Sequence, residues 1–246
     1  AAWVMSNEPW FKSLKKTVDN LKFRVSYGLV GNDKIGSEKN RFYYLSEMNM
    51  ESKNLAASFG ELRGHTYKGI DVVRYANEAI TWERSYKTNY AVELGLFDNF
   101  DLIAEYFTER RKDIFMTRAD VPETMGLQAG ISANIGEARA HGVDLQAEYQ
   151  KVWNKDFWTS ARANFTWSTG KYDVYEEPTY PEKYRQHAGY SIKQTWGYIA
   201  ERLFIDDEEA ANSPDQTSFG SQYGGGDIKY TDVNGDGKIT TADMVP

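Results

Sequence analysis

Cysteine is absent from the sequence, and this absence excludes several kinds of site. Without thiols the chain has no disulfide framework, no thiolate metal site and no cysteine nucleophile. The sequence also lacks any run of 18 apolar residues, so no transmembrane helix is expected. Its first residues contain neither the charged segment nor the apolar core of a signal peptide, and we expect any export signal to lie upstream.

Positive charge is also scarce. The chain carries 29 Lys+Arg against 36 Asp+Glu, a formal net charge of -7. Because nucleic-acid binders show a basic patch or stripe, no nucleic-acid partner is expected.

Enzyme motifs are lacking too. The sequence has no nucleophile elbow, no phosphate-binding loop and no zinc-protease motif, so we predict that the protein is not an enzyme. His65, His141 and His187 lie far apart and form no metal motif. The acidic run at 206–209 is interpreted as a solvated surface rather than a catalytic carboxylate pair.

The chain is rich in aromatic residues and contains segments in which apolar and polar residues alternate. Aromatic residues make up 15% of it. Five segments alternate apolar and polar residues with a period of two, which is typical of strands with two different faces. They are residues 21–28, 89–97, 101–109, 142–150 and 157–167. In the fourth, an apolar set (Val143, Leu145, Ala147, Tyr149) opposes a polar set (Asp144, Gln146, Glu148, Gln150). The third alternates less cleanly, because Ile103 and Phe107 lie on its polar face.

The connections between these segments are unequal in length. Short turns are predicted at 98–99 and 153–156, and long connections at 31–86, at 111–140 and after 168. Outer-membrane barrels have short turns at one end and long extracellular loops at the other, with aromatic girdles at both interfaces. Aromatic residues do flank the predicted strand ends: Phe97, Phe100, Trp153, Phe157 and Trp158 at one end, and Trp82, Tyr86, Trp167 and Tyr172 at the other. The alternative is that these aromatics fill the core of a soluble β-sandwich.

One motif carries specific chemistry, at residues 232–243. It fits an EF-hand-like calcium loop, in which hard oxygen ligands recur at fixed positions around one Ca²⁺ ion. Asp232, Asn234 and Asp236 fill positions one, three and five, Lys238 offers its carbonyl, and Thr240 and Asp243 fill positions nine and twelve. The motif departs from an EF-hand in two ways, since it ends in Asp rather than Glu and follows no helix. The alternative is a solvated turn without a metal ion.

Several stretches resemble one protein family, in order along the chain. They are AAWVMSNEPWF, LKFRVSYGLVGND, ITWERSYKTNYAVELGLFDN, EYFTERRKDIF, NIGEARAHGVDLQAEY and GDIKYTDVNGDGKITTADMVP. Together they resemble the barrel of SusC-like TonB-dependent transporters of Bacteroidetes, over nearly the whole chain.

The resemblance implies an all-β fold, as part of a large antiparallel transmembrane β-barrel with long extracellular loops in the cell outer membrane. Residues 1–246 would be a partial barrel domain that includes the calcium loop. The implied partners are membrane lipid, a SusD-like surface lipoprotein, the TonB complex and a glycan or peptide cargo.

Nothing in the chain resembles the family's plug or its closing strands. We therefore expect the native polypeptide to be much longer. The competing hypothesis is a secreted, calcium-stabilised β-sandwich that binds carbohydrate. In a barrel the apolar faces point to lipid on every strand, whereas in a sandwich they meet each other.

Overall fold

The computed structural model describes residues 1–34, 42–220 and 222–246. The chain forms two compact units, Ala1–Glu176 and Glu177–Pro246, which are described separately below. None of the helices in the described ranges is long and apolar enough to cross a membrane.

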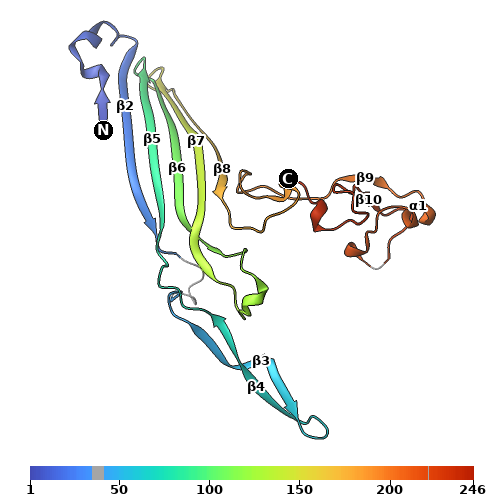
Figure 1. Cartoon of the computed structure of the whole chain (residues 1–246). Helices are drawn as coiled ribbons and strands as arrows, with labels where there is room; N and C mark the ends of the chain where they lie inside the picture. Colours follow the sequence, from blue (N-terminus) through green and yellow to red (C-terminus); the bar gives the residue numbers. More distant parts are fainter. Residues whose placement is uncertain (35–41, 221) are drawn as a thin grey trace. The chain divides into compact units, whose positions relative to one another are not determined.

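The first unit is built on a six-stranded antiparallel sheet with the order β1-β2-β5-β6-β7-β8 (Figure 1). Its strands are β1 (Ala2–Val4), β2 (Val18–Asn32), β5 (Glu83–Leu96), β6 (Phe100–Thr117), β7 (Ser132–Val152) and β8 (Trp158–Val174). The five predicted segments lie in β2, β5, β6, β7 and β8, and these strands are consecutive neighbours as the alternation required. The predicted all-β architecture is confirmed, and the sheet is open in this chain.

The strands are longer than the segments that alternate. They contain between 14 and 21 residues, whereas a tilted membrane-spanning strand needs about 9–11. The predicted connection at 111–140 was too long, because β6 continues to Thr117 and β7 already begins at Ser132. Alternation marks only the part of a strand whose two faces have different surroundings, so the ends of these strands carry no such signal.

Two short turns join β5 to β6 and β7 to β8. In the first, Phe97 and Asp98 adopt positive φ angles of 56° and 54°. In the second, the Trp153 amide donates to the Phe157 carbonyl at 3.0 Å. Both turns lie at the same end of the sheet, as predicted from their lengths.

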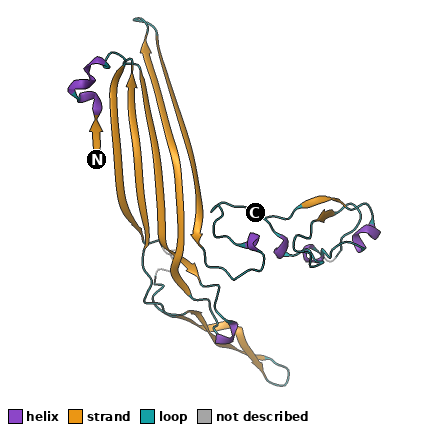
Figure 2. Ribbon diagram, turned by 45° about the horizontal axis from the view of Figure 1, so that its top comes forward, coloured by secondary structure: helices purple, strands orange, loops and turns teal. Residues whose placement is uncertain are grey.

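The predicted long connection at 31–86 contains a hairpin of β3 (Glu47–Phe59) and β4 (His65–Arg74), drawn in orange in Figure 2. Residues 35–41 of that connection lie outside the described residues. The register of the hairpin shifts at three places, which breaks the period of two and hides the strands from sequence analysis. The Val72 amide donates to Gln128 Oε1 at 2.9 Å, so the hairpin lies beside the β6–β7 connection.

Short 3₁₀ helices complete the first unit: η1 (Met5–Asn7), η2 (Pro9–Ser13) and η3 (Glu123–Met125). Phe11 in η2 is buried, with 1% of its surface exposed, and it anchors the segment that leads from β1 into β2.

The second unit is mostly irregular. Its elements are η4 (Lys183–Arg185), β9 (Ala200–Leu203), α1 (Asp207–Ala211), η5 (Thr217–Phe219), β10 (Ile228–Tyr230) and η6 (Thr241–Asp243). β9 and β10 pair antiparallel. The most deeply buried apolar side chains are Phe204, Ala210 and Ile239, so the unit has a small core of its own.

Candidate functional site

One face of the main sheet is apolar across five strands. The strand register aligns its side chains in rows, and two neighbouring rows are Val25–Tyr90–Tyr106–Val143–Trp167 and Phe23–Val92–Ala104–Leu145–Phe165. These rows extend the apolar set of the fourth segment across β2, β5, β6, β7 and β8.

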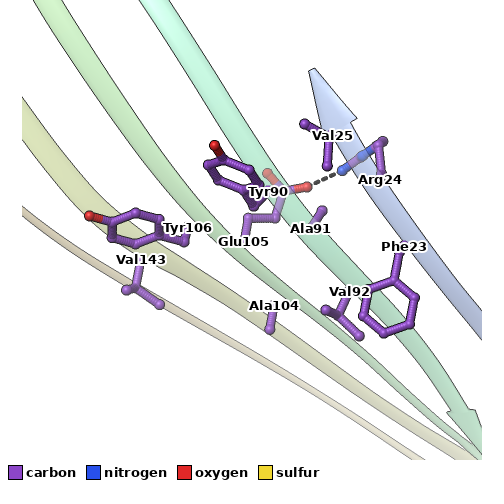
Figure 3. Close-up of a pocket in the computed structure, with 10 residues that line it drawn as sticks. All are labelled: Phe23, Arg24, Val25, Tyr90, Ala91, Val92, Ala104, Glu105, Tyr106 and Val143. Atoms are coloured by element: carbon purple, nitrogen blue, oxygen red, sulfur yellow. Dashed lines mark hydrogen bonds and ion pairs between the residues drawn. The ribbon is translucent and has the colours of Figure 1, made fainter. Parts of the chain in front are cut away.

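This apolar face is exposed within the first unit. Tyr90 and Trp167 are each 50% exposed and Leu145 is 37% exposed. Figure 3 shows a shallow hollow on the sheet, lined by side chains such as Phe23, Val92 and Ala104 on adjacent strands. Among the described residues of the unit, no second sheet covers this face, so the apolar faces do not meet as they would in a sandwich. An apolar surface of this width needs a non-aqueous neighbour.

The opposite face carries a network of charges. Lys22 Nζ lies 3.1 Å from Glu93 Oε2. Arg24 bridges Glu93, at 3.7 Å, and Glu105, to which it also donates a hydrogen bond. Asn89 Nδ2 donates to Glu105 Oε2 at 2.9 Å. The ion pairs thus connect β2, β5 and β6 side by side.

A second cluster lies further along the same face, around Glu109. Its carboxylate accepts from Ser85 Oγ at 2.6 Å and from Arg111 Nε at 2.8 Å. Lys87 Nζ is 3.9 Å away, and Arg111 also lies 3.6 Å from Glu83. Charged side chains of this kind are costly in lipid, so this face requires water or protein beside it.

A sheet that is apolar on one face and ion-paired on the other separates lipid from a polar interior. Its neighbouring strands pair along most of their length, as the hydrocarbon region of a membrane demands. The site is therefore the wall of a transmembrane β-barrel, and no catalytic cluster is needed for that role.

Aromatic residues gather at the end with the short turns. Phe97, Trp153, Phe157 and Trp158 are each more than half exposed there. Trp153 donates from its indole N–H to Thr159 at 3.0 Å, and Lys151 lies over its ring at 4.4 Å. An aromatic ring with a cation beside it suits the boundary between lipid and headgroups.

The candidate calcium loop is compact and closed by its own hydrogen bonds. Asp232 accepts from the amides of Gly235, at 2.7 Å, and Gly237, at 2.8 Å. Gly235 and Gly237 have φ angles of 75° and 81°, so the expected sharp turn at position six is present. Asp236 accepts from the Lys238 amide at 2.8 Å and from Asn234 Nδ2 at 3.0 Å.

Asp243 closes the loop from the other side. It is fully buried, and its two oxygens accept from the amides of Val233, at 2.9 Å, and Thr240, at 2.8 Å. Thr240 caps η6 by accepting from the Ala242 amide at 3.1 Å. In the described part of the chain, no three acidic or histidine side chains come close enough together to hold a metal ion. The oxygen donors suit Ca²⁺ by their chemistry, and calcium binding stays a prediction.

The acidic run at 206–209 is not solvated throughout, because Glu209 connects three other groups of the second unit. Glu209 accepts from Arg202 Nη1 at 2.9 Å, from the Ile205 amide at 2.9 Å and from Lys229 Nζ at 3.1 Å. The Arg202 guanidinium and then the Ile205 amide lower the pKa of Glu209 to about 2. Asp206 caps α1 by accepting from the Glu209 amide at 2.8 Å. Only the spatial pairing of β9 with β10 reveals this role.

Comparison with known proteins agrees with this geometry. The family described as "TonB dependent receptor-like, beta-barrel" matches residues 16–243. TonB-dependent receptor P3 of Formosa agariphila is 26% identical over 98% of this chain and 24% of its own length. TonB-dependent receptor SusC of Bacteroides thetaiotaomicron is 24% identical over 68% of this chain and 16% of its own length.

A similar fold occurs in a solved structure, the RagAB peptide importer in its "open-open" state. The TM-score is 0.65 at 16% identity, over 99% of this chain and 24% of that chain. The protein belongs to the TonB-dependent receptor-like β-barrel family, whose members reside in the outer membrane. The chain spans about a quarter of the length of the curated relatives P3, P39 and P26.

Proposed function

We propose that this chain forms part of the barrel wall and extracellular loops of an outer-membrane TonB-dependent importer of large nutrients. The observation that carries the proposal is the sheet with one apolar face and one ion-paired face. The relatives named TonB-dependent receptor support it. The proposed role involves no catalysis.

The partners follow from the same proposal. The TonB complex would supply the energy for import, and a SusD-like surface lipoprotein would act with the extracellular loops. Glycans and peptides are the two cargo classes. The relative named SusC and the fold neighbour described as a peptide importer support these assignments in general terms.

Thiol labelling tests the wall, because this chain has no cysteine of its own. Leu145→Cys and Gln146→Cys occupy adjacent positions on opposite faces of β7 and form a matched pair. In a cysteine-free background of the full-length protein in native membranes, a lipid-soluble maleimide should label Leu145→Cys. A water-soluble maleimide should label only Gln146→Cys. Equal labelling of both positions by the water-soluble reagent contradicts the proposal that this sheet is a barrel wall with one face in lipid.

Growth tests the import. A strain that lacks the full gene should fail to grow on one class of polysaccharide or peptide as sole carbon source. The wild-type gene should restore growth only when TonB is present. Normal growth of the deletion strain on every class argues against an importer.

We propose further that the loop at 232–243 binds one Ca²⁺ ion as a structural cofactor. The supporting observations are the spacing of its oxygen donors and the glycine turn at its centre. The ligands would be Asp232, Asn234, Asp236, the Lys238 carbonyl, Thr240 and Asp243. Ion binding would require the carboxylates of Asp232 and Asp236 to turn from the backbone amides towards the ion.

Calcium titration by calorimetry tests the metal. We expect the full-length protein to bind with a dissociation constant of about 10⁻⁴–10⁻³ M, the range of extracellular calcium modules. The double variant Asp232→Ala/Asp236→Ala should abolish the heat signal and speed protease cleavage at 224–226. The control Glu201→Ala/Glu208→Ala removes two carboxylates from the same unit but outside the loop, and should bind normally. A double loop variant that still binds as tightly as the parent shows that the loop is only a turn.

A further inference from the structure

A hollow in the second unit has no part in the wall. It has a volume of about 290 Å³ and lies between η5 and β10. Its lining includes three aromatic side chains, Phe219, Tyr223 and Tyr230, together with Gln216, Gln222 and Asp227. Small-molecule sites occupy roughly 300–1,000 Å³, so the hollow is sized for one small ring rather than an extended chain.

One wall of the hollow is an aromatic platform. The rings of Phe219 and Tyr230 have centroids 5.0 Å apart and an interplanar angle of 39°. Tyr198 supports both, with its centroid 4.8 Å from Phe219 and 5.6 Å from Tyr230. Phe219 is nevertheless 49% exposed. A ring that is fixed by two neighbours and still half exposed offers a rigid surface for stacking.

The floor is held in place by Gln216, which is only 4% exposed. Its amide group donates to the Ile228 carbonyl at 2.9 Å and accepts from the Tyr230 amide at 2.8 Å. Both bonds attach the segment before η5 to β10. The platform is therefore formed before any ligand arrives, which reduces the entropy cost of binding.

The same floor is joined to the loop at 232–243. The Asp215 carbonyl accepts from the Ile239 amide at 2.8 Å, and Ser218 Oγ donates to the Ile239 carbonyl. Ile239 is fully buried. Asp215 is thus fixed to the loop through its backbone, and Ser218 in η5 through its side-chain hydroxyl.

The polar lining consists of amides, one carboxylate and tyrosine hydroxyls. Asp227 accepts from the Gly224 amide at 2.9 Å through one oxygen. None of the described lining residues is a lysine or arginine, so an anionic ligand would find no cation here. An aromatic face attracts C–H groups of partial positive charge, because the ring face is negative.

We propose that this hollow binds one sugar ring of a glycan, which rests on the proposed function as a nutrient importer. The C–H face of the pyranose stacks on the exposed face of Phe219, which Tyr198 and Tyr230 hold in place. Its hydroxyl groups meet Asp227 and Gln222. A neutral ring with an apolar face and a hydroxyl rim matches both parts of this lining.

Saturation-transfer NMR tests the proposal on the full-length protein in a sugar-free detergent. The probes are methyl α-glucoside, methyl β-galactoside and methyl α-mannoside at millimolar concentration, with a Gly-Phe-Gly peptide as the competing class. At least one glycoside should receive saturation from the protein. Phe219→Ala should weaken its binding about threefold to tenfold, the scale of one aromatic contact.

Further variants separate stacking from damage to the fold. Phe219→Tyr keeps the ring and should bind normally, and Asp227→Asn should weaken binding by changing the acceptor for the hydroxyls. Phe59→Ala removes a ring that is 59% exposed in β3 and should change nothing. The proposal is overturned if no glycoside receives saturation, if Phe219→Ala binds as the parent does, or if only the peptide binds. Thiol labelling of β7 is independent of these outcomes. A failure of the sugar-binding proposal can therefore be distinguished from a failure of the proposed barrel wall.

Discussion

A single arginine on the apolar face should destabilise the barrel far more than one on the polar face. Leu145 lies in the row between Ala104 and Phe165 and is 37% exposed. It lies within the 9–11-residue spanning stretch that ends at the turn after β7, between the centre of that stretch and its far end. Arginine on the lipid face of a barrel costs about 2–4 kcal/mol at the bilayer midplane and about 0–1 kcal/mol near the interfaces. A cost of about 1–3 kcal/mol at this intermediate depth lowers the folding equilibrium constant by a factor of roughly 5 to 150, at 1.4 kcal/mol per tenfold.

The assay is folding of the full-length protein into lipid vesicles, followed by urea titration and the shift of the folded band on unheated gels. Leu145→Arg should lower the urea midpoint strongly. Gln146→Arg is the matched control, because its neighbour on the same strand and face is Glu148, whose carboxylate already accepts from Gln146 Nε2 at 2.8 Å. We expect the control to change the free energy of unfolding by no more than about 0.5 kcal/mol. Equal loss in both variants, or greater loss in the control, refutes the assignment of faces.

Two further predictions concern a glycine and a carboxylate. A Cβ at Gly142 would lie 2.4 Å from Phe107 Cζ. Gly142→Ala should therefore cost about 1–3 kcal/mol in the same urea titration, whereas Gly28→Ala, with nothing within 4 Å, should be nearly neutral. Glu209 has a pKa lowered from 4.5 to about 2, first by Arg202, so its stabilising effect is complete above about pH 4.5 and is lost as the pH falls towards 2. Pepsin cleavage of the second unit should accelerate over that interval in the parent, and Glu209→Gln should be cleaved rapidly already at pH 5.

The alternation of apolar and polar residues identified the membrane-spanning part of each long strand. It did so because the two faces of that part have different surroundings. Every second residue of β7 from Val143 to Tyr149 meets a different medium, and the sequence records this directly. The hairpin of β3 and β4 leaves no such record, because bulges shift its register at three places. Its exposed residues, such as Met50 and Tyr67, also include apolar side chains. A period of two is therefore a signal of strands whose two faces meet different surroundings, not of every strand.

The ion pairs of the polar face do not follow from the sequence alone. The alternation predicts that Arg24 and Glu105 lie on the same side of the sheet, but not that they pair. Their contact depends on the register between β2, β5 and β6, in which both align with Ala91. A small alanine between them leaves room for the arginine to reach across one strand. The Arg24–Glu105 ion pair can therefore be predicted only when the register of all three strands is known.

The irregularity in the third segment has the same origin. Phe107 lies on the polar face and opposes Gly142 on β7. Space for the ring exists because that neighbour has no side chain, and a Cβ there would also lie 2.5 Å from the Trp167 carbonyl oxygen on β8. An aromatic residue that departs from the pattern on one strand is therefore accommodated by a glycine on the next. A single residue that breaks the alternation is therefore compatible with a strand when the residue facing it on the next strand leaves room for it. Here the compensating glycine lies 35 positions further along the chain, and the register alone brings the two together.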